Sequence, residues 1–189
     1  NSRRLAAGDI VSIDFGAIVA GWHGDAARTF CVGEVRAAAA TLVEQTRQAM
    51  WAGIAAAARA ARVGDISHAI EQHAKRAPHR FGVVREYTGH GIGTSMHQPP
   101  DVPNHGRPRR GARLSKGMCL AIEPIFTLGS PMAVTLDDDW TVVTQDGSWA
   151  AHWENTVALA EDGPWVLTEP DGGRAELAAR GVRVSKLAD

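Results

Sequence analysis

The sequence has few of the features that mark secreted, membrane or nucleic-acid-binding proteins. It contains two cysteines, Cys31 and Cys119, which are far apart and form neither a metal-binding pair nor a disulfide framework, so a reducing, cytoplasmic compartment is predicted. It has no apolar run near the roughly 20 residues that a membrane helix needs. Its 20 basic and 21 acidic residues nearly cancel. We therefore expect neither nucleic acid nor a membrane as a partner.

The composition is that of a folded domain. Of the 189 residues 44% are apolar and 22% are charged, which is enough to bury a core and argues against disorder. Residues 1–168 are predicted to form one domain, and residues 169–189 a polar tail with one short helix around 174–180. The mixture of helix and strand patterns places the chain in the α+β class.

Local patterns predict the order of the elements. Residues 9–32 are predicted as a hairpin that turns at Ala20-Gly21, and the alanine-rich residues 34–62 as a helix that Gly64 ends. A second helix is expected from Asp65 or Ser67 to residue 77. The glycine-rich and proline-rich residues 89–113 are expected to be irregular, and strands are expected at 118–126, 140–144 and 149–159, in one antiparallel sheet.

Two aspartates interrupt the predicted hairpin. Asp14 and Asp25 would lie directly opposite each other if the turn were centred between Val19 and Ala20. Like charges at such a separation, roughly 5 Å between Cβ atoms, are destabilising. Either solvent covers that face of the hairpin or a cation turns the repulsive pair into a chelate.

Three further residues favour the cation. Glu123 and Glu154 each stand in a strand-like run that is otherwise apolar, and a buried carboxylate must neutralise, pair with a cation or bind metal. His90 lies between glycines that allow close approach of the backbone to other groups. For each residue alone, a structural role remains open. His97 is a candidate for contacting substrate, and His23 and His152, which lie beside predicted ligands, could orient carboxylates.

Four carboxylates and one imidazole form a ligand set that two divalent cations would balance in charge. The candidates are Co, Mn, Fe(II) or Zn, and the dominance of oxygen favours the first three over a structural zinc. In such a centre a bridging water becomes a hydroxide nucleophile at neutral pH, so the predicted chemistry is hydrolysis.

Several segments resemble the type I methionine aminopeptidases. The likeness runs from Leu5 to about Leu167, and its motifs follow the order of that family, in residues 8–14, 23–25, 84–93, 118–124, 138–142 and 151–157. It implies a pita-bread fold, with a curved antiparallel sheet and helices on its outer face. It also implies a dinuclear metal site held by Asp14, Asp25, His90, Glu123 and Glu154.

The resemblance also implies the role of each site residue. In that family the residues matching Asp25 and Glu154 bridge the metals, and the residue matching Glu123 is both a ligand and a catalytic proton shuttle. His97 matches a histidine that hydrogen-bonds the scissile amide region. Met96 and Trp140 match residues that line the methionine pocket. The implied reaction is removal of the initiator methionine from nascent polypeptides with a small second residue, by a monomer.

The chain departs from the family pattern in places. Asn155 stands where histidine is usual and Gln98 where glutamate is common. Family members carry a further segment before the position of Leu5, with another active-site histidine, so we expect this chain to be truncated at its amino end. Two alternatives stay open: a prolidase or Xaa-Pro aminopeptidase, and a non-catalytic pita-bread fragment that binds proteins. Residues 139–142 argue against the first, and the presence of all the ligands against the second.

Overall fold

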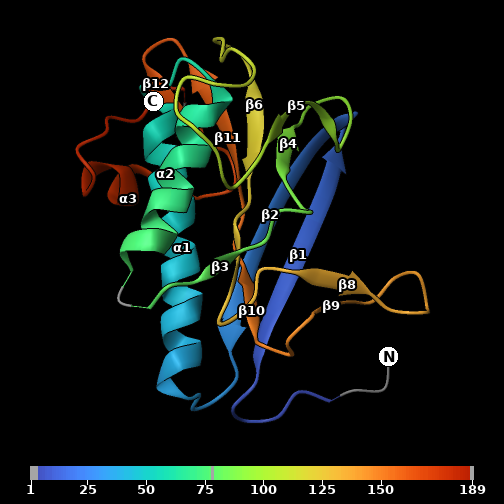
Figure 1. Ribbon diagram of the computed structural model, residues 1–189. Helices are drawn as coiled ribbons and strands as arrows, with labels where there is room; N and C mark the ends of the chain where they lie inside the picture. Colours follow the sequence, from blue (N-terminus) through green and yellow to red (C-terminus); the bar gives the residue numbers. More distant parts are fainter. Residues whose placement is uncertain (1–3, 78, 188–189) are drawn as a thin grey trace.

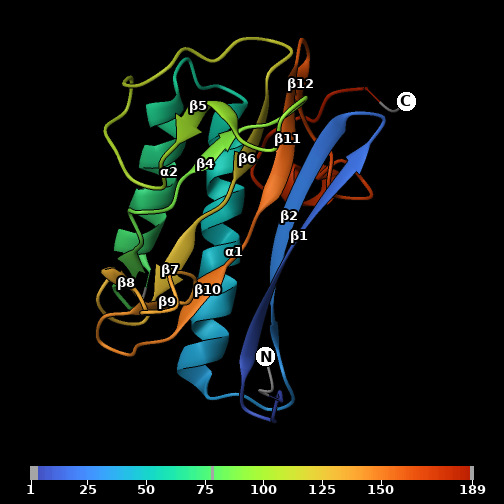
Figure 2. The same cartoon turned by 90° about the vertical axis from the view of Figure 1, so that its right-hand side faces the viewer.

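The computed structural model describes residues 4–77 and 79–187 (Figure 1). Helices α1 (Ala37–Ala57) and α2 (Val63–Arg76) lie side by side and pack against antiparallel strands. Figure 2 shows strands β10 (Ala150–His152) and β11 (Asn155–Ala160) between helix α1 and the long hairpin of β1 (Ile10–Val19) and β2 (Trp22–Cys31). The α+β class is confirmed.

The predicted hairpin is present, with a register that differs from the expected one. Ala20 and Gly21 have φ values of 50° and 83°, so both adopt the left-handed conformation that a tight hairpin turn requires. This centres the turn one position later, and Asp14 pairs with Ala27 while Asp25 pairs with Gly16. The expected direct pairing of Asp14 with Asp25 is wrong. The two aspartates are diagonal neighbours on one face of the hairpin.

The two predicted helices form with shifted ends. Gly64 was expected to terminate the first helix but lies in the first turn of α2, where a Cβ would stand 2.4 Å from the carbonyl oxygen of Arg107. Asp65 follows within that turn, and its Oδ2 accepts a hydrogen bond from the backbone N–H of Arg62 at 3.1 Å. Ser67 lies further along the helix and donates to the carbonyl of Val63. Asp65 therefore caps α2 from inside its first turn, and Pro78 lies outside the described residues.

Two predicted strands are each broken into two, and the breaks carry the predicted glutamates. Residues 118–126 form β6 (Cys119–Ile122) and β7 (Ile125–Thr127), separated by Glu123 and Pro124. Residues 149–159 form β10 and β11, separated by residues 153 and 154. Proline has no N–H to donate to a ladder, which explains the first break. Glu123 and Glu154 therefore lie side by side where two strands leave one sheet and enter another.

In the part of the chain that the structure describes, the expected single sheet is divided into four hydrogen-bonded groups. One has the strand order β12-β11-β6-β4-β5, another β10-β7-β3, and β1-β2 and β8-β9 form separate pairs. The strands not yet given are β3 (Gly82–Val83), β4 (Gly89–Gly91), β5 (Gln98–Val102), β8 (Ala133–Thr135), β9 (Val142–Thr144) and β12 (Gly163–Val166). The strand predicted at 140–144 begins two residues late, at Val142.

Residues 89–113 are not wholly irregular, as the sequence suggested, because β4 and β5 form an antiparallel pair with a bulge. The glycines are what admit β4 to the middle of its sheet. A Cβ at Gly89 would stand 2.3 Å from the carbonyl oxygen of Ala121, and a Cβ at Gly91 would stand 2.3 Å from that of Pro99. His90, between them, is thereby buried in the sheet.

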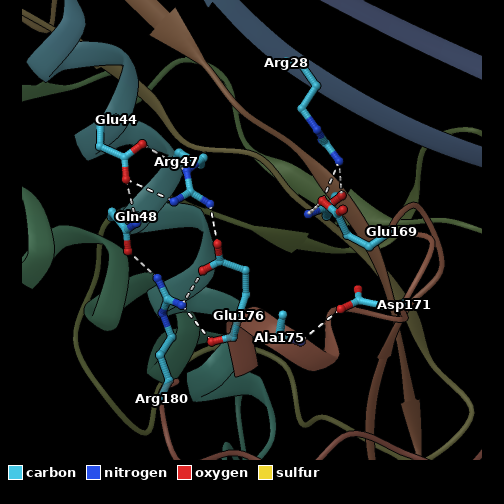
Figure 3. A network of polar contacts seen from close by, with 10 residues as sticks. Arg28, Glu44, Arg47, Gln48, Glu169, Asp171, Ala175, Glu176 and Arg180 are labelled. Carbon is cyan, nitrogen blue, oxygen red and sulfur yellow. Dashed lines mark hydrogen bonds and ion pairs between the residues drawn. The ribbon is translucent and has the colours of Figure 1, made fainter. Parts of the chain in front are cut away.

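The segment after residue 168 packs onto the core. Leu177, in the short helix α3 (Arg174–Ala178), and Val182 and Val184 belong to the main apolar cluster with residues of α1 and α2. Glu176 of α3 accepts from Arg47 of α1 at 2.6 Å and from Arg180 (Figure 3). The predicted division at residue 168 stays a prediction, and residues 188 and 189 lie outside the description. Among the described helices, none has the length and apolar character needed to cross a bilayer.

Candidate metal centre

Glu154 occupies the innermost position of the site. It follows β10, its side chain is buried, and its backbone N–H donates to the carbonyl of Ala27 at 2.9 Å. Burial, with the charges of Glu123, Asp25 and Asp14, raises the pKa of Glu154 to about 9, although the nearby Arg28 acts to lower it. Its Oε1 has no hydrogen-bond partner among the described residues. A carboxylate in this position favours a bound cation.

Glu123 lies between two imidazoles. Its Oε1 is 3.4 Å from Nε2 of His90, and its Oε2 is 3.4 Å from Nε2 of His152. The backbone carbonyl of Glu123 accepts from the side-chain amide of Asn104 at 3.1 Å, which fixes the chain at the strand break. The predicted burial of Glu123 is thus partial, since 14% of its side chain is exposed.

Asp25 and His90 approach the same centre from different strands. The backbone of Asp25 is held by Thr156, whose Oγ1 accepts from its N–H at 3.0 Å and donates to its carbonyl at 2.8 Å. Burial and the charge of Asp14 raise the pKa of Asp25, whereas His90 lowers it. With its Nδ1 donating to the carbonyl of Gly91 at 3.0 Å, His90 turns Nε2 toward the carboxylates as a free ligand atom.

The side chains form two trios of potential ligand atoms, each with all members within 4.8 Å of one another. One trio is Asp25, His90 and Glu154, and the other is Glu123, His152 and Glu154. Glu154 is shared. Oxygen and imidazole donors suit Mn, Fe, Co or Zn, and a divalent cation would offset the charge repulsion and satisfy the orphaned Oε1 of Glu154. The residues present therefore fit a divalent metal centre.

The remaining predicted site residues surround this cluster at different depths. Asp14 is exposed on β1 and belongs to neither trio, although its charge reaches Asp25 and Glu154. The exposed ring of His97 lies edge-on to that of His90, with centroids 4.4 Å apart. The Met96 methyl group lies over Gly16, 2.6 Å from where a Cβ would stand. Trp140, in the β8–β9 connection, is 86% exposed.

Sequence reasoning missed the support behind the cluster, which is centred on Arg28. This guanidinium donates to the backbone carbonyls of Ala27, at 2.9 Å, and Glu154, and it pairs with Glu169 at 2.8 Å (Figure 3). Asn155 joins the same network, because its Oδ1 accepts from Arg28 at 2.8 Å and its Nδ2 donates to Glu169. The available signal was the position of Arg28, which lies in the same predicted strand as the ligand Asp25.

Comparisons with known proteins agree with this geometry. Metallopeptidase family M24 matches residues 1–161. A methionine aminopeptidase of Clostridium acetobutylicum is 52% identical over 166 residues, which are 88% of this chain and 66% of that protein. The chain thus spans less than two thirds of that relative's length.

Solved structures extend the likeness to the fold. A methionine aminopeptidase from Rickettsia prowazekii matches with a TM-score of 0.85 and 38% identity, covering 89% of this chain and 68% of that one. A prolidase from Pyrococcus furiosus matches with a TM-score of 0.67 and 22% identity, over 89% of this chain and 44% of that one, which shows the fold alone. The pita-bread fold is confirmed, and the chain belongs to metallopeptidase family M24, among its type I methionine aminopeptidases.

Proposed function

We propose that this chain hydrolyses the amino-terminal methionine from polypeptides whose second residue is small. The observation that carries the proposal is the convergence of Asp25, His90 and Glu154 with Glu123 in one cluster whose ligand atoms lie within 4.8 Å in each trio. The names of the relatives at 52% and 38% identity supply the class of substrate. The prolidase-like alternative has support only from the shared fold.

The proposed centre holds two divalent ions, Co, Mn, Fe(II) or Zn, with Asp14, Asp25, His90, Glu123 and Glu154 as ligands. Bound ions would activate a water and polarise the scissile carbonyl. Glu154 is shared by both trios, and it would bridge the two positions together with Asp25, to which the resemblance also assigns a bridging role. The raised pKa values of Asp25 and Glu154 support this, because each carboxylate gains most from a nearby cation.

The other residues would handle the peptide and the proton. Glu123, partly exposed at the strand break, would carry a proton from the attacking water to the leaving amine. His97, exposed beside His90, would hydrogen-bond the scissile amide. Met96, whose methyl group lies over Gly16, and Trp140 would line the pocket for the methionine side chain. We further propose that the protein acts as a monomer in the cytoplasm on peptide amino termini.

The test compares hydrolysis of Met-Gly-x, Ala-Gly-x and x-Pro peptides, each with added Co, Mn, Fe(II) or Zn. The proposal requires that Met-Gly-x is cleaved fastest. Faster cleavage of x-Pro peptides would favour the prolidase-like activity, and no cleavage with any of the four metals would defeat the proposal for this chain.

His97 provides a sharper prediction. Because it lies outside both trios, replacing it with alanine should lower turnover by roughly 10- to 100-fold, the range of one hydrogen bond made to a reacting group, and leave metal content unchanged. Turnover of Met-Gly-x and bound metal are measured on the same preparation. The exposed His79 serves as the matched control, and H79Q should change neither quantity. Loss of metal from H97A would contradict the assigned role.

A further inference from the structure

His152 carries a partly buried imidazole to which the proposed function assigns no role. It ends strand β10, where only 14% of its side chain is exposed. Its Nε2 is inaccessible to solvent and has no hydrogen-bond partner among the described residues. A buried polar atom without a partner is costly unless something else satisfies it. Oε2 of Glu123 lies 3.4 Å from this Nε2.

That separation is characteristic of two ligands of one ion. It exceeds the range of about 2.7–3.2 Å for an N–H···O hydrogen bond. Two donor atoms that each lie about 2.1 Å from one ion at a tetrahedral angle are about 3.4 Å apart. The opposite oxygen of Glu123 stands at the same 3.4 Å from Nε2 of His90, a predicted metal ligand. His152 therefore mirrors His90 across Glu123.

His152, like His90, belongs to a trio of potential ligand atoms. His152, Glu123 and Glu154 lie within 4.8 Å of one another, as do His90, Asp25 and Glu154. Oε1 of the fully buried Glu154 is also without a hydrogen-bond partner among the described residues. Each trio thus combines carboxylates with one imidazole around an unsatisfied carboxylate oxygen, and neither trio is a purely acidic cluster.

The backbone holds His152 in this position. Its N–H donates to Oγ1 of Thr29 at 3.0 Å, and the same hydroxyl donates to its carbonyl at 2.6 Å. Thr29 lies on β2, the strand that also carries Asp25. His152, on β10, is thereby fixed to the strand that carries Asp25. Such fixed positions provide the preorganisation that a metal site needs.

We propose that His152 is a metal ligand, which adds a second imidazole to the centre beside Glu123 and Glu154. The inference rests on the two-ion centre of the proposed function. With His90, the centre would then hold two imidazoles. Imidazole suits Fe, Co and Zn better than it suits Mn, so His152 would shift the metal preference of the centre toward those metals.

The test measures metal binding and not turnover. Metal-free protein is titrated with Mn(II) or Co(II) by calorimetry, for the wild type, His152→Gln and the control His79→Gln. We expect two ions per wild-type chain and per control chain. His152→Gln should keep one ion at its original affinity and bind the other at least about 10- to 100-fold more weakly, the loss seen even for residues that only support a ligand.

A second measurement does not depend on the variant folding. Pulsed electron paramagnetic resonance of the Mn(II)-loaded wild type, with histidine labelled by nitrogen-15, should show two coordinated imidazole nitrogens. A single coordinated nitrogen, or unchanged binding of both ions by His152→Gln, would overturn the proposal and leave the proposed function intact. Two coordinated nitrogens in a protein that cleaves no Met-Gly-x would support the ligand and defeat the proposed function.

Discussion

The cluster has two unlike sides. On the inner side, Glu154 is 1% exposed at a strand break and its backbone is tied to β2 and to Arg28. On the outer side, Asp14 is exposed on β1, and His97 is also exposed. Both sides bear predicted ligands, but only the inner residues assemble into trios of ligand atoms.

The difference separates two demands on such a centre. A buried carboxylate such as Glu154 interacts strongly with a cation because little solvent screens it. When no cation is present, burying its negative charge costs free energy. An exposed carboxylate such as Asp14 binds more weakly and lies where a substrate can approach. We infer that the inner side sets metal affinity and the outer side faces the peptide.

The largest expected effect is that of Glu154→Gln. The amide keeps the shape of the side chain but cannot serve as a charged ligand shared by both trios. We expect metal affinity and Met-Gly-x turnover to fall by more than about 100-fold, beyond the loss typical of residues that only support a ligand. Calorimetry and peptide hydrolysis measure the two quantities. Retention of two ions at wild-type affinity would contradict the inner position of Glu154.

The free energy of unfolding of the metal-free protein should fall as the pH rises. The pKa of Glu154 is about 9 in the fold, against 4.5 for an ordinary glutamate, so the folded chain binds more protons between these values. Its contribution to the free energy of unfolding is therefore constant below pH 4.5 and falls as pH rises toward 9, by at most about 1.4 kcal/mol per pH unit.

Chemical denaturation of chelated protein at pH 6, 7 and 8 measures this slope. The matched control is Glu154→Gln, which has no proton to lose, so the difference between the two slopes isolates this residue. Added divalent metal should abolish the difference by stabilising the charged carboxylate. Equal slopes in the two metal-free proteins would show that Glu154 ionises normally in the fold.

Most of the predicted ligands lie together in the structure, but the sequence did not predict how they are arranged. Glu123 and Glu154 could be singled out because carboxylates in apolar runs need a partner, and the structure brings them together with Asp25 and His90. The hairpin was also predictable from its composition, since Ala20-Gly21 interrupts two strand-like arms. These signals are local in sequence, so they could be recognised without the structure.

What the sequence did not predict depends on contacts between distant segments. The register that makes Asp14 and Asp25 diagonal follows from the backbone conformation of the turn. The burial of β4 follows from the fit of Gly89 and Gly91 against neighbouring backbone. The network of Arg28 joins residues more than 120 positions apart. Such arrangements depend on packing, for which no short motif exists.

A smaller effect is expected for Arg28→Lys, which changes the support of the inner side and leaves every ligand in place. Arg28 reaches Asn155 and Glu169 with one nitrogen and two backbone carbonyls with the other, and lysine cannot span both. We expect the free energy of unfolding to fall by roughly 1–3 kcal/mol, the range for hydrogen bonds to a charged group that is partly buried. Arg59→Lys, on an exposed side chain, is the control for the substitution itself. Equal stability of the two variants would remove Arg28 from the support of the cluster.

The smallest effect is expected on the outer side, from Asp14→Asn. Because Asp14 is exposed and lies outside both trios, solvent screens its charge, and its loss should weaken metal binding by about 10-fold, against more than about 100-fold for Glu154→Gln. The same change removes a negative charge that raises the pKa of Asp25 and Glu154. The metal-free variant should therefore lose less stability between pH 6 and 8 than the wild type does. Calorimetry and denaturation on the same preparation test both effects, and a loss of affinity as large as that of Glu154→Gln would erase the distinction between the two sides.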